Sequence, residues 1–528
     1  MRALLALTLA AAAHAQITGK QLLEPPAKDW LHYNGQFHSQ RHSPLTQVNR
    51  ATVKGLTAQW IFGIPGARQL QTVPIVVDGV MYVSAPNEIY ALDARTGRLV
   101  WDYHRSSAIA KGPNRGVAVY GNKVYMTTPD AFLIAVDARN GSLLWEKEIM
   151  KASDGYWSPA APLVVPPTTP NGPARVIAGM APSDHGLNGG LDAYDAETGE
   201  RLWRWNSIPA PGEPGHETWS GDSWKTGGGG TWLTGSYDPE LKLLYWGLGN
   251  PAPDFDGDVR KGDNLYTECI VALDVETGKM RWFFQNTPHD VHDWDSVEVP
   301  ILVDADFRGR KRKLIVQANR NGFYYVLDRE SGEFLHGTPF VQKLNWASGL
   351  DDKGRPIRVP GIVPSFQGTK TCPATSGATN WMSPAYNPDT GFFYVVAQEG
   401  CGINTKSRDT FRPGGFSYMA TGYIESPADP WQMYVRALDV TTGKVQWEYK
   451  QVSSRRYGAG VMSTAGGLVF AADDQGFLTA LDAKSGEALW HFNTGQPIKS
   501  QPISFAIGGR QYIAIAAGTN VVAFALPR

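Results

Sequence analysis

Short runs of alternating apolar and polar residues recur along the chain, and each run ends at the same kind of turn. The run "EIYAL" leads into Asp93, which is followed by Gly97 and then by Trp101. Alternation with a period of two predicts a β-strand that buries one face. Aspartate caps the turn that follows, and glycine accepts a positive φ there. The segment therefore predicts a β-hairpin whose second strand ends on a large aromatic side chain.

This hairpin pattern is an internal repeat. Asp is followed by Gly after four residues and by Trp after four more in Asp93/Gly97/Trp101, Asp137/Gly141/Trp145, Asp195/Gly199/Trp203, Asp274/Gly278/Trp282, Asp439/Gly443/Trp447 and Asp482/Gly486/Trp490. A degenerate copy at Asp328 carries His336 in the Trp position, and "NPDTGFFYVV" near Asp389 is a weaker copy. Each copy exposes an apolar face that only a neighbouring copy can cover.

Eight such units predict an all-β fold, an eight-bladed β-propeller built from tryptophan-docking repeats, with functional loops between the blades. A β-solenoid is the alternative fold, and the long irregular insertions between the repeats argue against it. Because insertions between regular elements commonly carry function, the longest ones, 206–268 and 337–436, are the first places to look for a site.

The N-terminus has the composition of a secretory signal peptide. Arg2 precedes an apolar run, and Ala13-His14-Ala15 forms a cleavage motif before Gln16. We therefore predict that residues 1–15 are a signal peptide and that residues 16–528 form a single exported, periplasmic domain. A retained N-terminal anchor is the alternative. No later stretch approaches the ~20 apolar residues that a membrane span needs.

Charge and cysteine content narrow the classes of partner. A formal net charge of −1 argues against a nucleic acid or an anionic membrane held by bulk electrostatics. No Cys-x-x-Cys-His motif for covalent haem occurs.

Cys372 and Cys401 flank the segment around Asn380, and we predict a disulfide between them, since exported proteins keep such bonds. Cys269 begins an apolar strand and is predicted to stay free.

The densest titratable chemistry lies in "TPHDVHDWDS", residues 287–296, which contains two histidines and three aspartates. Two other stretches, "GGGGTW" at 227–232 and "GNPAP" at 249–253, are compatible with tight turns or with a ligand site. A zinc site built from His289 and His292 is one interpretation of the first stretch.

Together, the tryptophan repeat and the stretches "GSYDPELKLLYWGLGNPAP", "TPHDVHDWD", "QANRNGFYYVLDRESG" and "GATNWMSPAYNP" resemble the alcohol dehydrogenases of the methanol/ethanol type that depend on pyrroloquinoline quinone (PQQ). The resemblance covers about residues 25–525. It implies oxidation of an alcohol to an aldehyde by metal-assisted hydride transfer to PQQ. The metal would be Ca²⁺ or a lanthanide, and the electrons would pass to a separate soluble cytochrome c or similar acceptor.

The resemblance also implies a role for each matching residue. Asp293 would be the catalytic base. Cofactor-binding residues would be Arg115, Thr231, Trp232, Arg320 and Asn380. Metal ligands would be Asp184, Asn250, Asp293 and Asp295. Asp290, His289 and His292 would hold Asp293 in place and stiffen its loop.

The chain departs from the family pattern at several positions. Asp184 stands where glutamate is common, Gln71 where glutamate is frequent, and Pro159 where a hydroxyl donor is common. Ile109 and Ala110 occupy the positions of an adjacent-cysteine disulfide, and Tyr457-Gly458 replace a late tryptophan.

The second aspartate of "DWD" bears on the choice of metal. Asp295 adds a carboxylate two residues after Asp293, which resembles the members of the family that use a lanthanide. We therefore expect a light lanthanide to activate the protein more than calcium does. In the alternative, Asp295 pairs with a nearby Lys or Arg instead.

Two other functions compete with the alcohol dehydrogenase. A propeller built on the same repeat can act as a non-catalytic scaffold for envelope protein assembly, since fold alone does not set function. A PQQ enzyme of this fold that acts on sugars or aldehydes is the other possibility.

Overall fold

The computed structural model describes residues 17–25, 27–109, 112–452 and 457–528. The predicted signal peptide, residues 1–15, and Ala110 lie outside the described residues. Strands dominate the described chain, which confirms the all-β prediction.

Eight sheets of four or five strands contain most of these strands. The first four sheets, in chain order, are β3 (Ile75–Val77), β4 (Val80–Ala85), β5 (Glu88–Asp93) and β6 (Leu99–His104); β7 (Ala118–Tyr120), β8 (Lys123–Thr127), β9 (Phe132–Asp137) and β10 (Leu143–Glu148); β11 (Leu163–Val165), β12 (Arg175–Gly179), β13 (Gly190–Asp195) and β14 (Arg201–Asn206); and β15 (Ser236–Asp238), β16 (Leu243–Gly247), β17 (Cys269–Asp274) and β18 (Met280–Gln285).

The remaining four sheets are β19 (Ile301–Phe307), β20 (Arg310–Ala318), β21 (Phe323–Asp328) and β22 (Phe334–Pro339); β26 (Ala385–Asn387), β27 (Phe392–Glu399), β30 (Gln432–Asp439) and β31 (Val445–Lys450); β1 (His42–Ser43), β32 (Val461–Thr464), β33 (Leu468–Ala472), β34 (Phe477–Asp482) and β35 (Ala488–Asn493); and β36 (Ile503–Ile507), β37 (Arg510–Ala517), β38 (Asn520–Ala525) and β2 (Thr57–Gly63). Neighbouring strands are antiparallel in all eight, except that β1 pairs with β32 in parallel.

Smaller elements lie outside these sheets. The insertion at 337–436 forms a two-stranded sheet and a three-stranded sheet, made of β23 (Ala347–Leu350) with β24 (Pro356–Arg358), and of β25 (Thr369–Thr371), β28 (Gly402–Lys406) and β29 (Thr421–Glu425). The helical segments are α1 (Gly19–Leu23) and the 3₁₀ turns η1 (Val53–Gly55), η2 (Ala152–Asp154), η3 (Ser183–His185), η4 (His216–Thr218), η5 (Ser223–Thr226) and η6 (Gly257–Val259). None of the described helices has the length and apolar character that crossing a bilayer requires.

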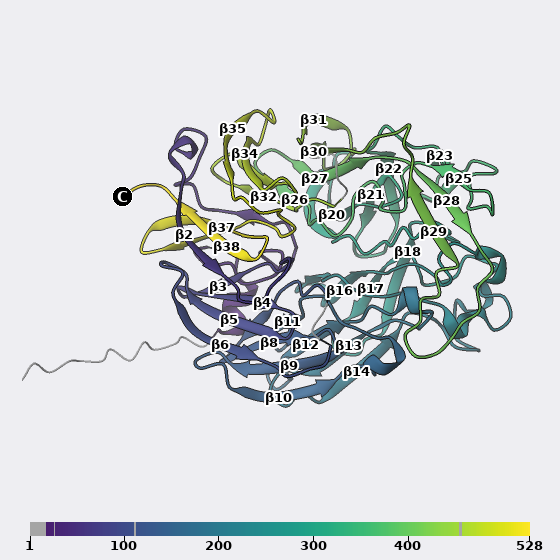
Figure 1. Ribbon diagram of the computed structural model, residues 1–528, viewed down its shortest axis with the longest axis horizontal. Coiled ribbons are helices and arrows are strands. Elements are labelled where there is room, and N and C mark those ends of the chain that lie inside the picture. The colour runs from purple at the N-terminus through teal and green to yellow at the C-terminus, as the bar shows by residue number, and fades with distance from the viewer. Residues whose placement is uncertain (1–16, 26, 110–111, 453–456) are drawn as a thin grey trace, which may run out of the picture.

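The eighth sheet joins the two ends of the chain. Figure 1 shows the sheets following one another around the molecule, with the early strand β2 in the same sheet as the late strands β38 and β37, next to β38. Phe62 of β2 pairs with Val521 of β38. The prediction of a separate unit near Asp389 is wrong, because the turn at 387–391 connects β26 to β27 within the same sheet that contains the Asp439 hairpin.

Tryptophan docking connects successive hairpins, except after the hairpin at Asp328, where Tyr324 and Thr338 cover the next turn glycine, Gly443. The indole of Trp101 donates a hydrogen bond of 2.9 Å to the carbonyl of Ala138, and its ring covers Gly141 in the following hairpin. A Cβ at Gly141 would lie 2.6 Å from that ring, so glycine is needed there for contact as well as for its φ of 75°. The indole of Trp490 donates to the carbonyl of Leu56 at 3.1 Å, which extends the same contact to the N-terminal segment.

The strand connections place the candidate residues at one end of the sheets. Asp184 follows β12, Asn250 follows β16 and Arg320 follows β20, each in the connection from the second to the third strand of its sheet. Asp293 lies between the last strand of one sheet, β18, and the first strand of the next, β19. Because antiparallel strands alternate in direction, both kinds of connection lie at the end opposite the repeated Asp-Gly turns.

The cysteine prediction is confirmed. Cys372 and Cys401 form a disulfide, and Cys269 is a buried free thiol at the start of β17. The disulfide connects the segment before Asn380 to the residues that follow β27.

Candidate active site

A cavity of about 210 Å³ lies among these connections. It is lined by Arg115, Trp157, Ala181, Ser183, Asp184, His185, Trp232, Asn250, Asp293, Asp295, Arg320, Asn380, Trp381 and Tyr457. Eight of the nine site residues predicted from the sequence are among them. Residues up to 342 positions apart thus meet at one cavity, as Arg115 and Tyr457 do.

Thr231 is the predicted residue that does not line the cavity. Its side chain is fully buried and donates a hydrogen bond of 2.6 Å to the carbonyl of Gly190. It also accepts one of 2.9 Å from the backbone N–H of Met180. Thr231 therefore anchors the backbone beneath Trp232 in this structure.

The glycine-rich loop before Trp232 packs against the backbone around Asn250. The N–H of Gly229 donates to the carbonyl of Asn250 at 2.9 Å, and the N–H of Gly249 donates to the carbonyl of Gly230 at 2.7 Å. A Cβ at Gly228 would lie 2.4 Å from the carbonyl oxygen of Asn250. The absence of side chains in this loop is what allows Trp232 and Asn250 to reach the same cavity.

Arg115 is a buried cation that faces the aromatic side chains of the site. Its guanidinium lies 5.0 Å from the ring centre of Trp232 and 5.8 Å from that of Trp381. Burial lowers the pKa of Arg115 to about 10. No carboxylate of the described residues forms an ion pair with it. A buried arginine of this kind is suited to bind an anionic ligand group.

Three carboxylates converge beside the cavity. One oxygen from each of Asp184, Asp254 and Asp293 lies within 4.8 Å of the other two. Asp254 was absent from the residues predicted from the sequence, although it follows Asn250 by four positions in the acidic stretch "PDFDGD". Carboxylate and amide oxygens in such a group are the ligands that hard cations prefer.

Asp295 pairs with Arg320, as in the alternative considered for it. One Asp295 oxygen contacts the guanidinium of Arg320, and the other accepts the backbone N–H of Asn250 at 2.8 Å. Arg320 also lies 3.4 Å from a carboxylate oxygen of Asp293 and donates to the carbonyl of Thr375 at 2.8 Å. Both Asp295 oxygens therefore have protein partners, and Asp295 is not one of the three converging carboxylates.

Partial or complete desolvation and mutual repulsion raise the pKa values of these carboxylates, of which Asp254 is buried, Asp293 is partly buried and Asp184 is exposed. Desolvation raises the pKa of Asp184, and desolvation together with the neighbouring carboxylates raises the pKa of Asp254 well above its ordinary value. The pKa of Asp293 is also raised well above its ordinary value by burial, although Arg320 opposes the shift. Burial raises the pKa of Asp295 to about 6. A group with a raised pKa is able to accept a proton near neutral pH or to bind a cation in its place.

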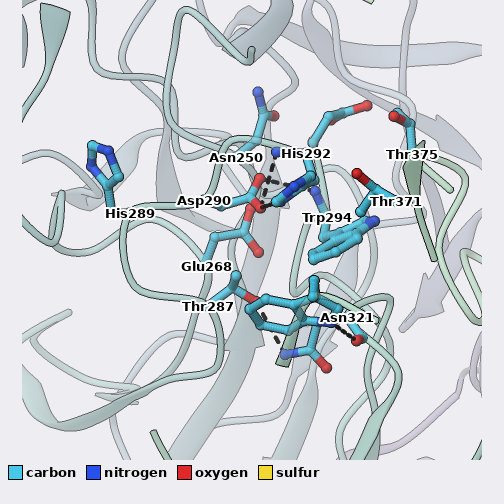
Figure 2. A network of polar contacts seen from close by, with 12 residues as sticks. Asn250, Glu268, Thr287, His289, Asp290, His292, Trp294, Asn321, Thr371 and Thr375 are labelled. Atoms are coloured by element: carbon cyan, nitrogen blue, oxygen red, sulfur yellow. Dashed lines mark hydrogen bonds and ion pairs between the residues drawn. The ribbon is translucent and has the colours of Figure 1, made fainter. Parts of the chain in front are cut away.

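Asp293 has a left-handed backbone conformation, with a φ of 60°. Asp290 stabilises it, because its carboxylate accepts the backbone N–H groups of His292 at 3.2 Å and of Trp294 at 3.1 Å, the residues on either side. The ring of His292 stacks on that of Trp294, with centroids 4.2 Å apart (Figure 2). The Trp294 indole donates to the carbonyl of Ala374 at 2.9 Å.

The two histidines of this segment do not form a shared metal site. Figure 2 shows His289 away from His292, and one ring nitrogen of His289 lies 2.8 Å from the carbonyl of Gly262. The close group of potential metal-binding side chains in the described chain contains neither histidine. The geometry therefore gives the zinc interpretation no support.

Six cavity residues were not identified as site residues from the sequence: Trp157, Ala181, Ser183, His185, Trp381 and Tyr457. Trp381 follows Asn380 directly in "ATNW", and its ring lies 4.6 Å from that of Tyr457. Its position next to Asn380 in this motif could have identified Trp381 as a site residue from the sequence. Trp157 and His185 stand in no pattern that distinguishes them from core aromatic residues.

Sequence comparisons identify the group of proteins to which this chain is similar. A family profile described as "Glucose/ethanol/alcohol dehydrogenase, beta-propeller domain" (PQQ) matches residues 30–341. A second profile, described as outer membrane protein assembly factor BamB, matches residues 432–525. The quinoprotein alcohol dehydrogenase PedH of Pseudomonas putida is 38% identical over 97% of this chain and 90% of the relative. A quinoprotein ethanol dehydrogenase of Pseudomonas putida is 35% identical over 92% and 85%.

Solved structures agree with the sequence comparisons. Quinohemoprotein alcohol dehydrogenase from Comamonas testosteroni superposes with a TM-score of 0.90 at 34% identity, covering 97% of this chain and 82% of that one. A europium-containing methanol dehydrogenase superposes with a TM-score of 0.88 at 31% identity, covering 96% and 99%. The profile, the full-length relatives and the solved structures lead to the same conclusion: the chain belongs to the PQQ-dependent quinoprotein alcohol dehydrogenase family.

Proposed function

We propose that this protein oxidises an alcohol to an aldehyde, with PQQ and one metal ion held in the cavity described above. The observation that carries the proposal is the meeting of the carboxylates of Asp184 and Asp293 with Trp232 and the unpaired cation of Arg115 at one cavity. A hard cation would occupy the acidic side, and an aromatic anion would occupy the side of Trp232 and Arg115.

The residues present fit both groups. PQQ is a planar aromatic quinone with three carboxylates, so it suits a flat indole surface next to a buried arginine. The Nε of Arg115 and the indole N–H of Trp381 are buried and have no partner among the described residues, which leaves donors available to an anionic ligand. Arg320 and Asn380 complete the set of residues that would contact the cofactor. Thr231 would not contact the cofactor directly but would hold the backbone next to Trp232 in place.

The metal ion would be held by oxygen atoms of Asp184, Asn250 and Asp293, with Asp295 and its partner Arg320 beside them. When bound, PQQ and the cation supply a two-electron acceptor and a Lewis acid. The structurally similar methanol dehydrogenase is described as containing europium. Together with the number of carboxylates here, this supports a lanthanide as the preferred ion, with calcium as the alternative.

The protein's own contribution is to position a base and to control its charge. Asp293 would accept the proton of the alcohol hydroxyl as hydride leaves the carbon. Burial keeps its pKa high enough for it to take up that proton, and Arg320 stabilises the ionised form between turnovers. Asp290 fixes the direction of the Asp293 side chain through the backbone on both sides.

The eight sheets support a single eight-bladed propeller formed by residues 16–528. Each sheet would be one blade, and the pairing of β2 with β38 would close the ring with strands from both chain ends. Tryptophan docking between successive hairpins would hold adjacent blades together.

Export and electron transfer complete the proposal. The composition of residues 1–15 supports secretion into the periplasm. The sequence has no Cys-x-x-Cys-His motif, so we propose that a separate soluble cytochrome c or similar carrier accepts the electrons.

Reconstitution tests the function directly. The purified chain is titrated with PQQ in the presence of Ca²⁺ or La³⁺, and bound PQQ is followed by absorbance. Oxidation of primary alcohols is then measured with a dye acceptor and with oxidised cytochrome c. We expect stoichiometric PQQ binding and turnover of alcohols.

Two results would favour the other functions. Failure to bind PQQ would favour the scaffold, a class that the BamB profile match at residues 432–525 brings into consideration. Turnover of sugars or aldehydes in preference to alcohols would change the substrate class.

A further inference from the structure

Asp254 is a buried carboxylate with an oxygen that lacks a partner. The residue is fully buried, and its Oδ2 has no hydrogen-bond partner among the described residues. An ionised carboxylate buried in this way is strongly disfavoured unless a cation or a proton compensates it. The Asp184 and Asp293 oxygens within 4.8 Å increase the need for a positive charge at this point.

The nearby arginines do not provide that charge through a direct contact. Arg260 is buried close by, but it donates to the side chain of Asn264 and to backbone carbonyls, including those of Pro253 and Asp290. Arg320 is engaged by Asp293, Asp295 and the carbonyl of Thr375. In the described part of the chain, no ion pair reaches the Asp254 carboxylate.

Asp254 also sets the orientation of the Asn250 amide. Its Oδ1 accepts a hydrogen bond of 2.7 Å from Nδ2 of Asn250. Because an ionised carboxylate can only accept, the amide must present its NH₂ group to Asp254. Its carbonyl oxygen then lies on the other side of the amide, free to bind a cation. Asp254 thus fixes one predicted ligand while its own second oxygen remains available.

We propose that Asp254 is itself a ligand of the metal ion, through Oδ2, so that three carboxylates and one amide oxygen of this chain surround the cation. The inference rests on the proposed function and extends it, since neither the sequence motifs nor the comparisons assign Asp254 a role. Large cations such as Ca²⁺ take about six to eight oxygen ligands, so a fourth protein ligand is readily accommodated. The Asp254 carboxylate also adds a ligand at a site where Asp184, with its shorter side chain, stands in place of the more common glutamate.

Asp254→Asn separates the two roles of this residue. Asparagine keeps an oxygen that accepts from Asn250, but it places an NH₂ group where Oδ2 was, and that group cannot bind a cation. Asp256→Asn is the matched control. Asp256 is also buried and lies two residues away, but it accepts the backbone N–H of Asp258 and is not one of the three converging carboxylates.

The experiment uses the full chain loaded with PQQ and Eu³⁺. Luminescence lifetimes in H₂O and D₂O report the number of water molecules bound to the ion, and titration reports its affinity. For Asp254→Asn we expect one additional bound water and an affinity at least about tenfold lower, by analogy with the loss of other metal-site partners. For Asp256→Asn we expect wild-type values.

A measurement without metal checks that Asp254→Asn folds. Removing a buried like charge should raise the unfolding temperature of the metal-free chain, while the added stabilisation by Eu³⁺ should be smaller than in the wild type. If this variant does not fold, Asp254→Ser is measured in the same way.

The outcomes distinguish this inference from the proposed function. Equal water number and affinity in the wild type and Asp254→Asn would overturn the ligand role while leaving the proposed function in place. If only Asp254→Ala, and not Asp254→Asn, lowered the affinity, Asp254 would merely orient Asn250. A wild-type chain that binds neither PQQ nor Eu³⁺ would overturn both proposals.

Discussion

Asp290 holds Asp293 in a left-handed backbone conformation by accepting the N–H groups of the residues on either side of it. A non-glycine residue in this conformation is strained by roughly 1–3 kcal/mol and persists only where its surroundings impose it. The strained residue here is the one whose carboxylate faces the cavity, so the strain and the direction of the side chain have the same cause.

Asp290→Ala should therefore lower both stability and turnover. We expect a loss of about 1–3 kcal/mol in the free energy of unfolding, because two buried N–H groups lose their acceptor. The turnover number should fall while PQQ binding is retained. Chemical denaturation and steady-state kinetics provide the measurements. Asp290→Asn keeps one acceptor oxygen and should give intermediate values, whereas a variant with unchanged turnover would show that Asp293 needs no such support.

Asp293→Asn should abolish alcohol oxidation while the chain still folds and binds PQQ. The expected loss is ~10²–10⁴-fold in turnover number, which is typical for removal of a general base. Thermal unfolding and PQQ absorbance serve as the controls for folding and loading. Near-normal turnover with PQQ and metal supplied would rule out Asp293 as the base.

The wild-type protein should be more active with a light lanthanide such as La³⁺ than with Ca²⁺. Four carboxylates, Asp184, Asp254, Asp293 and Asp295, lie at or beside the cavity, and Arg320, which pairs with Asp293 and Asp295, neutralises only part of their charge. A trivalent ion offsets more of the remaining negative charge than a divalent ion does. In Asp295→Ala we expect the preference to reverse. Equal activation of the wild type by both ions at saturating PQQ would show that the second aspartate is structural.

Metal binding should strengthen as the pH rises. The pKa of Asp295 is raised to about 6, and those of Asp184, Asp254 and Asp293 are also raised, so the folded metal-free chain holds protons that the unfolded chain has lost. Native stability from these groups is full below about pH 4 and is lost as the pH rises through the folded pKa values. A cation replaces those protons and prevents that loss.

The increase in unfolding temperature on adding Ca²⁺ should accordingly be larger at about pH 7.5 than at about pH 5. The buried His32 and the partly buried His42, whose pKa values desolvation lowers to about 4, titrate in the opposite sense but act equally with and without metal. An equal increase at both pH values would contradict the assigned carboxylate ligands.

Gly141→Ala should destabilise the protein more than Gly121→Ala. Both glycines have positive φ values, 75° and 58°, so alanine at either costs roughly 1–2 kcal/mol in backbone strain. Only at Gly141 would the new methyl group also meet the ring of Trp101, at 2.6 Å, whereas Gly121 has open space. We expect an additional loss of about 1–3 kcal/mol at Gly141, measured by denaturation. Equal losses would mean that the Trp101 ring shifts to accommodate the extra methyl group at little cost in free energy.

Local patterns accounted for the hairpins. In the turn at Asp93, the carboxylate accepts the N–H groups of Arg95 and Thr96, and Gly97 has a φ of 72°. These interactions join residues only a few positions apart, so the spacing and the residue types are enough to predict them. The chemistry of the site was also marked locally, because its residues lie in distinctive short motifs, and eight of the nine predicted residues line one cavity.

What local patterns missed depends on contacts between distant segments. The eighth sheet pairs residues near position 60 with residues near 522, and no repeat motif marks that closure. The ion pair of Asp295 with Arg320 and the convergence of Asp254 with Asp184 likewise join separate connections between strands. A carboxylate in a short motif can bind a proton, an arginine or a cation. Only the distances to its neighbours and its burial decide which of these it faces, because the free energy of a charge depends on what replaces its water.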